Sequence, residues 1–311
     1  MEKYTFWKSV FVMILAFGHL TFCFTGTEDQ APAKKHGTLR EPRLNFGVFN
    51  IFQFPNIPCT VGDQTGTCYS ALDCIGKGGN FSGSCAKGFG VCCLFIQSCG
   101  GSVSDNNTYF VNPGYPSPSS RNELCSMTVK KISSNICQLR LDLEQFDTVG
   151  PDLMTGTCRA DSFSVSGQDI NSIVPVLCGK NSGQHVYVEV GSSSGPFTVR
   201  MISSNVTYSR MWKIRVSQML CNSVNKAPPG CLQYYSGATG LFQSFNYGNQ
   251  NPEKGYLANL NYAICFRREA VSFFVAVSGP ITVSVLTDQL HDPIIPGFQL
   301  RYTQMACSLS K

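Results

Sequence analysis

Apolar and polar residues alternate in many short runs along the middle of this chain. Such alternation is typical of β-strands that bury one face and expose the other. Turn-forming Gly, Pro, Asn and Ser separate the runs at short intervals. The clearest runs are Gln138–Leu143, Phe163–Val165, His185–Val190 and Phe197–Met201. Many short strands joined by regular turns predict an all-β sandwich.

The N-terminus has a different pattern, a nearly continuous apolar run over Val10–Phe24 that follows Lys3 and Lys8. The run is shorter than the about 20 apolar residues that a membrane-spanning helix needs. A basic start, a short apolar run and small residues behind it are typical of a secretory signal peptide. We therefore expect a signal peptide over 1–26, no membrane span and a secreted, extracellular chain. An uncleaved signal anchor is the alternative.

We expect residues 27–58 to form a leader or linker that contains one aromatic segment. The seven residues Phe46–Phe52 contain three Phe, and Phe54 follows after one polar residue. This spacing predicts an extended strand that has to cover its apolar side chains. It would dock onto the following module or onto a partner.

The cysteines divide the rest of the chain into a dense part and a sparse part. Six of the sixteen lie within residues 59–93, and those behind Cys99 are widely spaced. So short a stretch cannot bury a sufficient core, which predicts a small module held together by disulfides. A zinc cluster is the competing interpretation, but the C-x₂₋₄-C spacing it needs is absent. Disulfides require an oxidising compartment, in agreement with secretion.

Composition limits the partners. Charged residues are only 14% of the chain, which suits turn-rich β-structure. The net charge of +5 falls to about +4 without the signal peptide, and it is too scattered for a nucleic-acid groove. The basic cluster Lys34–His36 has acidic neighbours, so we interpret it as a solvated linker rather than a heparin or membrane patch.

The dense cysteine module resembles the clip domain of arthropod extracellular proteases and their inactive relatives. The residues that carry the resemblance are Cys59, Gly66-Thr67-Cys68, Cys74, Cys85 and Val91-Cys92-Cys93. The gap between the third and fourth cysteines is shorter than usual for clip domains. The resemblance implies a clip-like module over 59–93 with the disulfides Cys59–Cys92, Cys68–Cys85 and Cys74–Cys93.

Residues 99–221 resemble a CUB domain. The resemblance rests on Cys99-Gly100-Gly101, Asn112-Pro113-Gly114-Tyr115-Pro116, Cys125, Leu139…Phe146, Cys158-Arg159-Ala160-Asp161, Cys178-Gly179, Phe197–Val199 and Trp212–Val216. It implies a jelly-roll-like β-sandwich with the disulfides Cys99–Cys125 and Cys158–Cys178.

Residues 222–311 resemble a second CUB unit that is too short. Tyr234–Tyr247 repeats the opening, Cys231 and Cys265 imply a disulfide, and Pro280–Val285 and Gly297–Tyr302 supply closing strands. No C-x-x-D strand lies between Cys265 and Pro280. These pairings leave Cys137, Cys221 and Cys307, so one cysteine would be free, would bridge another chain in a disulfide-linked dimer, or has lost its partner. We expect an internal deletion near Ala270–Val271.

No catalytic residues are recognisable in the sequence. Three histidines lie outside the expected signal peptide: His36 in a linker, His185 in a strand and His291 in a turn. None of them lies near a nucleophile motif. No protease domain follows the clip-like module, so we expect no enzyme activity and no cofactor.

The sequence also bears on calcium binding and on glycosylation. Many CUB domains bind calcium through a glutamate and two aspartates, but only Asp161 matches in residues 99–221, so no metal site is expected. The sequons predict glycans at Asn80, Asn106 and Asn205.

The combination resembles secreted insect CUB-domain proteins. It predicts a non-catalytic adhesion protein that recognises an extracellular protein or glycan through Asn112–Ser120 and Thr148–Thr157. Tyr115 and Asp161 are the candidate ligand-binding residues, and Phe46–Phe54 is a secondary site. The alternative is a regulatory cofactor of a clip-protease cascade in innate immunity; a structural matrix component is a third interpretation.

Overall fold

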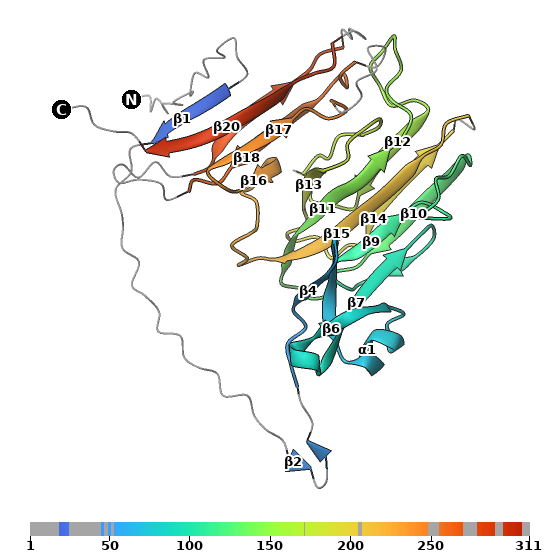
Figure 1. The fold of residues 1–311 in the computed structure, drawn as a ribbon. Coiled ribbons are helices and arrows are strands. Elements are labelled where there is room, and N and C mark those ends of the chain that lie inside the picture. The colour runs from blue at the N-terminus through green and yellow to red at the C-terminus, as the bar shows by residue number, and fades with distance from the viewer. Residues whose placement is uncertain are drawn as a thin grey trace, which may run out of the picture.

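The computed structural model describes residues 53–306, apart from 171, 205–206, 248–254, 270–278 and 290–294, and the backbone of three N-terminal strands. These are β1 (His19–Phe24), β2 (Asn45–Phe46) and β3 (Phe49–Asn50). The described chain is mainly β-structure, with one short helix, α1 (Ala71–Gly76), and one 3-10 turn, η1 (Ala86–Gly88). Figure 1 shows a small module around α1, a sandwich of long strands and a second group of strands that contains β16, β17, β18 and β20.

The disulfide module has four strands around a very small core. Its strands are β4 (Pro58–Val61), β5 (Gln64–Tyr69), β6 (Asn80–Cys85) and β7 (Gly90–Gln97). The core consists of Tyr69, Cys74, Cys93 and Phe95. A Cβ at Gly79 would lie 2.2 Å from Sγ of Cys93, so only glycine fits there. With so little apolar area, the bridges supply most of the stability, typically about 2–5 kcal/mol each.

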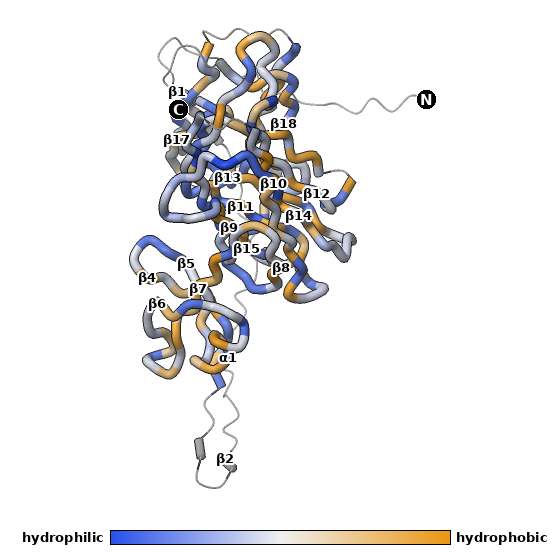
Figure 2. The backbone as a smooth tube through the Cα atoms, turned by 90° about the vertical axis from the view of Figure 1, so that its right-hand side faces the viewer, coloured by the Kyte–Doolittle hydropathy of each residue, from blue (hydrophilic) through white to orange (hydrophobic). Residues whose placement is uncertain are grey.

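The module is joined to the sandwich through a shared sheet. Strand β7 pairs in parallel with β9 (Thr108–Val111), with Phe95 opposite Thr108. Leu94, Tyr109 and Val111 are buried together at this contact. The sheet therefore continues from the module into the sandwich across the boundary that the sequence predicts between residues 93 and 99. The module lies at one end of the molecule (Figure 2).

The predicted all-β sandwich is confirmed. One sheet has the order β12 (Asp161–Ser166), β14 (Phe197–Ser203), β10 (Glu123–Val129), β8 (Ser102–Val103). The facing sheet has the order β13 (Gln184–Glu189), β11 (Ile136–Asp147), β15 (Met211–Leu220), β9. Leu139, Leu141 and Leu143 alternate with polar residues on β11 and are buried against β-strands of the facing sheet.

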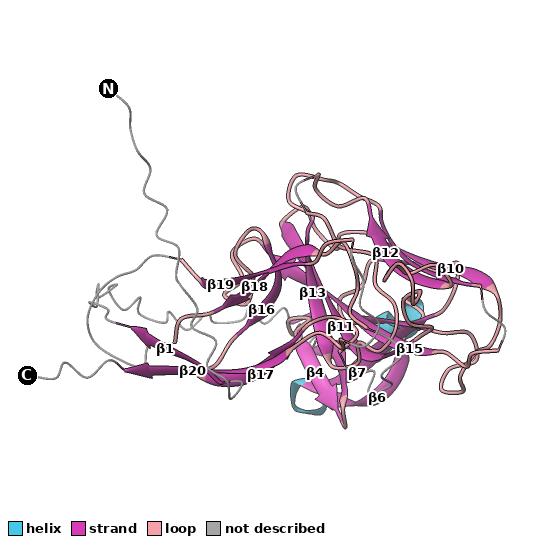
Figure 3. Cartoon of the chain, turned by 90° about the horizontal axis from the view of Figure 1, so that it is seen from above, coloured by secondary structure: helices cyan, strands magenta, loops and turns pink. Residues whose placement is uncertain are grey.

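The second unit also has two layers of strands. One is β16 (Cys231–Tyr235), β18 (Asn261–Phe266), β19 (Ile281–Leu286). The other is β17 (Thr239–Gln243), β20 (Gln299–Ala306), β1. Strand β1 belongs to the expected signal peptide; its backbone pairs in parallel with Arg301–Ala306 of β20. Figure 3 shows this unit beside the sandwich, with β16 near β13.

The two units share one hydrophobic core. Leu232, Phe242, Phe266 and Tyr302 of the second unit belong to the same buried cluster as Leu141 of the first. The Phe266 ring lies 4.5 Å from that of Tyr302, measured between centroids. The second unit therefore buries its apolar residues partly against the first.

The aromatic segment differs from the single extended strand that its sequence predicts. It contains two short strands, β2 and β3, which pair antiparallel with Phe46 opposite Phe49. Further along, Phe54 lies on the disulfide module: a Cβ at Gly90 would be 2.7 Å from its Cζ. At Phe54, therefore, the segment docks onto its own chain.

Candidate functional site

A fully buried ion pair organises the loop end of the first sandwich. Asp161, at the start of β12, accepts hydrogen bonds from Nε and Nη2 of Arg210 at 2.6 and 2.9 Å, and both side chains are 0% exposed. The N–H of Val149 donates to the same carboxylate at 2.8 Å. The backbone of Arg210 exchanges two hydrogen bonds with Ser119. The pair therefore holds Asn112–Ser120 and Thr148–Thr157 at one end of the sandwich.

This geometry leaves no place for a cation at Asp161. The Arg210 guanidinium already supplies the positive charge, in the two-bonded arrangement that arginine makes with carboxylates. Nearby, Asp147 accepts a hydrogen bond from the Tyr208 hydroxyl at 2.5 Å and pairs with Lys180 at 3.4 Å. Among the described residues, no group of three His, Cys, Asp or Glu is placed to hold a metal. The residues present do not fit the calcium ion that many CUB domains carry.

The loop Thr148–Thr157 ends in a turn braced by Asp152. One carboxylate oxygen of Asp152 accepts from the N–H groups of Met154 and Thr155 and from the Thr155 hydroxyl. These bonds lower the pKa of Asp152, led by the one from the Thr155 side chain. The turn presents Met154 with 85% of its surface exposed, beside an exposed Leu153. The hydrogen bonds within the turn thus hold the apolar side chains of Leu153 and Met154 toward solvent.

More exposed apolar residues lie on the connection between β12 and β13. Ile170, Ile173 and Val176 are all exposed. The disulfide Cys158–Cys178 joins this connection to the short segment between the braced turn and β12. Ile170 and Ile173 lie near Glu189, at the end of the sandwich away from the braced turn, whereas the carbonyl oxygen of Val176 lies 3.7 Å from the Sγ of Cys158.

Tyr115, the other candidate ligand-binding residue, is half-buried. It packs against Leu94, Tyr109 and Val111 at the contact between the module and the sandwich. Its N–H donates to the carbonyl of Asn112. The structure therefore places Tyr115 as an anchor of its loop, whereas Asp161 lies in the buried ion pair.

The predicted glycosylation positions differ in their surroundings. Asn80 is exposed on β6. The Asn106 side-chain oxygen accepts from the N–H of Gln218 at 2.7 Å, which fixes its amide. Asn205 lies outside the described residues, as does Ala270–Val271.

The structure contains seven disulfides in the described chain. Six join the cysteines that the two resemblances pair: Cys59–Cys92, Cys68–Cys85, Cys74–Cys93, Cys99–Cys125, Cys158–Cys178 and Cys231–Cys265. The seventh joins Cys137 to Cys221, which the sequence left open. Cys307 lies outside the described residues.

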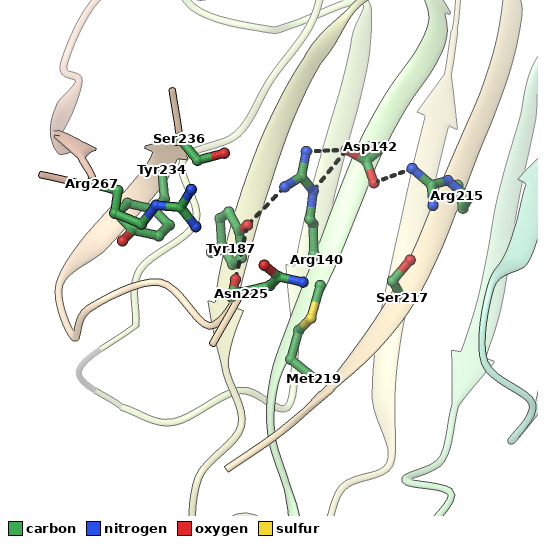
Figure 4. A pocket seen from close by; sticks show the side chains of 10 residues that line it. All are labelled: Arg140, Asp142, Tyr187, Arg215, Ser217, Met219, Asn225, Tyr234, Ser236 and Arg267. Carbon is green, nitrogen blue, oxygen red and sulfur yellow. Dashed lines mark hydrogen bonds and ion pairs between the residues drawn. The ribbon is translucent and has the colours of Figure 1, made fainter. Parts of the chain in front are cut away.

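A cavity of about 290 Å³ lies where the outer face of the β13–β11–β15 sheet meets the second unit (Figure 4). We call it the junction cavity. It is lined by Arg140, Asp142, Tyr187, Arg215, Ser217, Met219, Asn225, Tyr234, Ser236 and Arg267. Asp142 links Arg140 and Arg215 across neighbouring strands at 2.7 and 2.9 Å. Pattern reasoning missed this site because its residues come from both units.

His185 lies behind the junction cavity, on β13. Its Nε2 accepts the N–H of Tyr234 at 3.0 Å, and its ring packs against Tyr187 and Tyr235. Burial, reinforced by the charge of Arg140, lowers the pKa of His185 to about 4. This histidine is neutral at physiological pH and joins the two units.

Two family models match parts of the chain. Residues 99–216 match the CUB domain model, and residues 228–278 match the animal CUB domain model. These residues therefore belong to CUB domains. No curated protein matches the chain.

Among solved structures, the Ca²⁺-bound CUB2 domain of MASP-1 is 17% identical over 38% of this chain and 98% of that chain, with a TM-score of 0.30. The CUB1-EGF-CUB2 domains of rat MASP-1 are 11% identical over 64% and 98%, with a TM-score of 0.30. The corresponding human MASP-1/3 domains are 11% identical over 63% and 98%, with a TM-score of 0.28.

Proposed function

We propose that this chain is a secreted, non-catalytic protein that binds another extracellular protein through the loop end of its first CUB domain. CUB domains are typically extracellular binding modules, and the many disulfides suit that compartment. The proposal assigns residues 1–26 to a signal peptide, 27–58 to a leader, 59–93 to a clip-like module, 99–221 to the first CUB domain and 222–311 to the second.

The braced turn carries this proposal. Burying a side chain as apolar and exposed as Met154 against a partner is favourable, because it removes apolar surface from water. The hydrogen bonds to Asp152 keep the turn in one conformation, so little entropy is lost when it binds. The apolar character of Leu153 and Met154 favours a protein over a glycan.

The test places a photo-crosslinking amino acid at Met154 and exposes the full chain to extracellular fluid of its source. We expect one crosslinked protein, displaced by unlabelled wild-type chain. The double variant Leu153→Ser, Met154→Ser should compete roughly 30-fold less well, since a central apolar contact is worth about 2 kcal/mol. Val224→Ser, at a residue 83% exposed elsewhere, is the matched control and should compete normally. Equal competition by both variants would reject the loop end as the binding surface.

A second candidate function has an observation of its own. The disulfide module exposes Leu72, Ile75, Phe81 and Phe89, an unusually apolar surface for so small a unit. These residues would let a clip-like module dock a protease, as a regulatory cofactor of an extracellular cascade. A Leu72→Ser, Ile75→Ser variant that loses an effect on zymogen activation, while Leu153→Ser, Met154→Ser retains it, would favour this function.

A further inference from the structure

The junction cavity has the features of a ligand site and lies on a different face from the proposed loop-end surface. Pockets for small ligands often form where two units meet, with a few polar groups fixing the ligand. The volume of about 290 Å³ suits a single small group. Tyr234, Ser236 and Arg267 come from the second unit, and Arg140 and Arg215 from the first. The site therefore exists only when both units are in place.

The charges at the cavity leave one positive charge unbalanced. Arg140, Arg215 and Arg267 line it with Asp142 as the only lining acid. Behind them, Glu144 pairs with Arg215 and Lys213, and Glu269 pairs with Arg267. Counting these, four cations face three carboxylates. One negative charge from a ligand would complete the balance.

Several donors remain unused. Arg215 donates from Nε to Glu144 and from Nη2 to Asp142. Arg267 donates from Nε and Nη2 to Glu269. In both, Nη1 has no hydrogen-bond partner in the described part of the chain. The existing pairs hold each guanidinium in place, so a ligand would meet donors that are already oriented.

Two aromatic rings add a second element of recognition. Tyr187 and Tyr234 line the cavity with ring centroids 6.2 Å apart. A tyrosine ring face covers the apolar face of a ligand, while its hydroxyl remains a polar group. Burial raises the pKa of Tyr234, so its hydroxyl keeps its proton and can donate.

We infer that the junction cavity binds a single carboxylate group. A planar, singly charged carboxylate matches both the arginine donors and the charge balance, whereas a doubly charged phosphate would overcompensate. Two ligands share this chemistry: an acidic sugar, whose apolar face would lie on the tyrosine rings, and an acidic side chain of a protein.

The test titrates the full chain with sodium glucuronate and with N-acetylglutamate α-amide, following the arginine Nε–H signals by NMR. Glucose and N-acetylglutamine amide are the neutral controls. We expect saturable shifts with the carboxylates and none with the neutral compounds. Tighter binding of glucuronate identifies the sugar source, and tighter binding of the glutamate compound identifies the protein source.

Variants distinguish binding at a defined site from nonspecific attraction to a charged surface. Arg267→Gln should weaken binding about tenfold, and Tyr234→Phe about threefold, since each removes a donor. Glu269 stays held by the N–H of Gly237 in the first variant, so the fold should survive. Arg200→Gln, at an exposed arginine on β14, is the matched control. Absence of saturable binding, equal binding of neutral probes, or unchanged affinity in Arg267→Gln would overturn the inference.

Discussion

The first CUB domain and the second CUB unit are built from equivalent strands. In the first, β8 pairs in parallel with β10, and β10 pairs antiparallel with β14. In the second, β16 pairs in parallel with β18, and β18 pairs antiparallel with β19. The bridges Cys99–Cys125 and Cys231–Cys265 enter corresponding strands, β10 and β18.

The difference lies at the outer edges of these sheets. In the first domain, β14 pairs onward with β12, and β15 pairs onward with β11. Within the described residues of the second unit, β19 pairs with β18 alone, and β20 pairs with β17 and β1. In the part of the second unit that the structure describes, no strand pairs with β19 in the way that β12 pairs with β14. The internal deletion near Ala270–Val271 stays a prediction, because these residues lie outside the described chain.

The comparison shows how an incomplete sandwich can still bury its apolar residues. A sheet has to cover its apolar face, and a few strands alone rarely do so. Here Phe242, Phe266 and Tyr302 join the core of the neighbouring domain. The second unit is therefore stable only when it packs against the first domain.

The largest expected effect comes from breaking the ion pair that organises the complete domain. Arg210→Met leaves the Asp161 carboxylate buried without its cation, which costs about 3–5 kcal/mol of unfolding free energy. Urea denaturation measures it. Adding Asp161→Asn should restore part of the loss, because an amide carries no charge to leave unpaired. A loss below about 1 kcal/mol in the single variant would show that the pair does not hold this loop end.

The next effect concerns His185, at the contact between the units. Its pKa is lowered to about 4 in the folded chain, against an ordinary value of 6.5. Between pH 6.5 and pH 4, His185 binds a proton in the unfolded chain but stays neutral in the folded chain. Stability is therefore full above pH 6.5 and falls as the pH drops toward 4, by about 3 kcal/mol.

The measurement is the unfolding free energy at several pH values, for wild type and His185→Gln. The variant removes this proton uptake while the carboxylates still titrate, so the difference between the two isolates the histidine. The charged groups Arg140 and Asp142 act on the same ring and should be left intact. Parallel curves for the two proteins would contradict a role of His185 at the junction.

The smallest effect is expected from metal removal. Because Arg210 occupies the Asp161 carboxylate, calcium has no site there. Excess EDTA or millimolar calcium should each change the melting temperature by less than about 1 °C, a few tenths of a kcal/mol. A larger calcium-dependent rise that disappears in Asp161→Asn would place a metal at this end of the sandwich.

Sequence patterns predicted the structural features that depend on residues close together in the chain. Alternation along Gln138–Leu143 predicted a half-buried strand because side chains in a strand point alternately to opposite faces. The Cys137–Cys221 bridge and the pairing of Asp161 with Arg210 could not be predicted, since each joins residues far apart in the chain. The same holds for the contact of His185 with Tyr234, which depends on how two units pack.

Urea unfolding followed with two probes tests whether the second unit is stable only on the first. Trp212 is the only tryptophan beyond Trp7, so its fluorescence reports the first domain when the signal peptide is absent. Fluorotyrosine NMR at Tyr302 reports the second unit. A shared core predicts coincident transitions with one midpoint. A Tyr302 transition at clearly different urea, with Trp212 unaffected, would show that the two units fold independently.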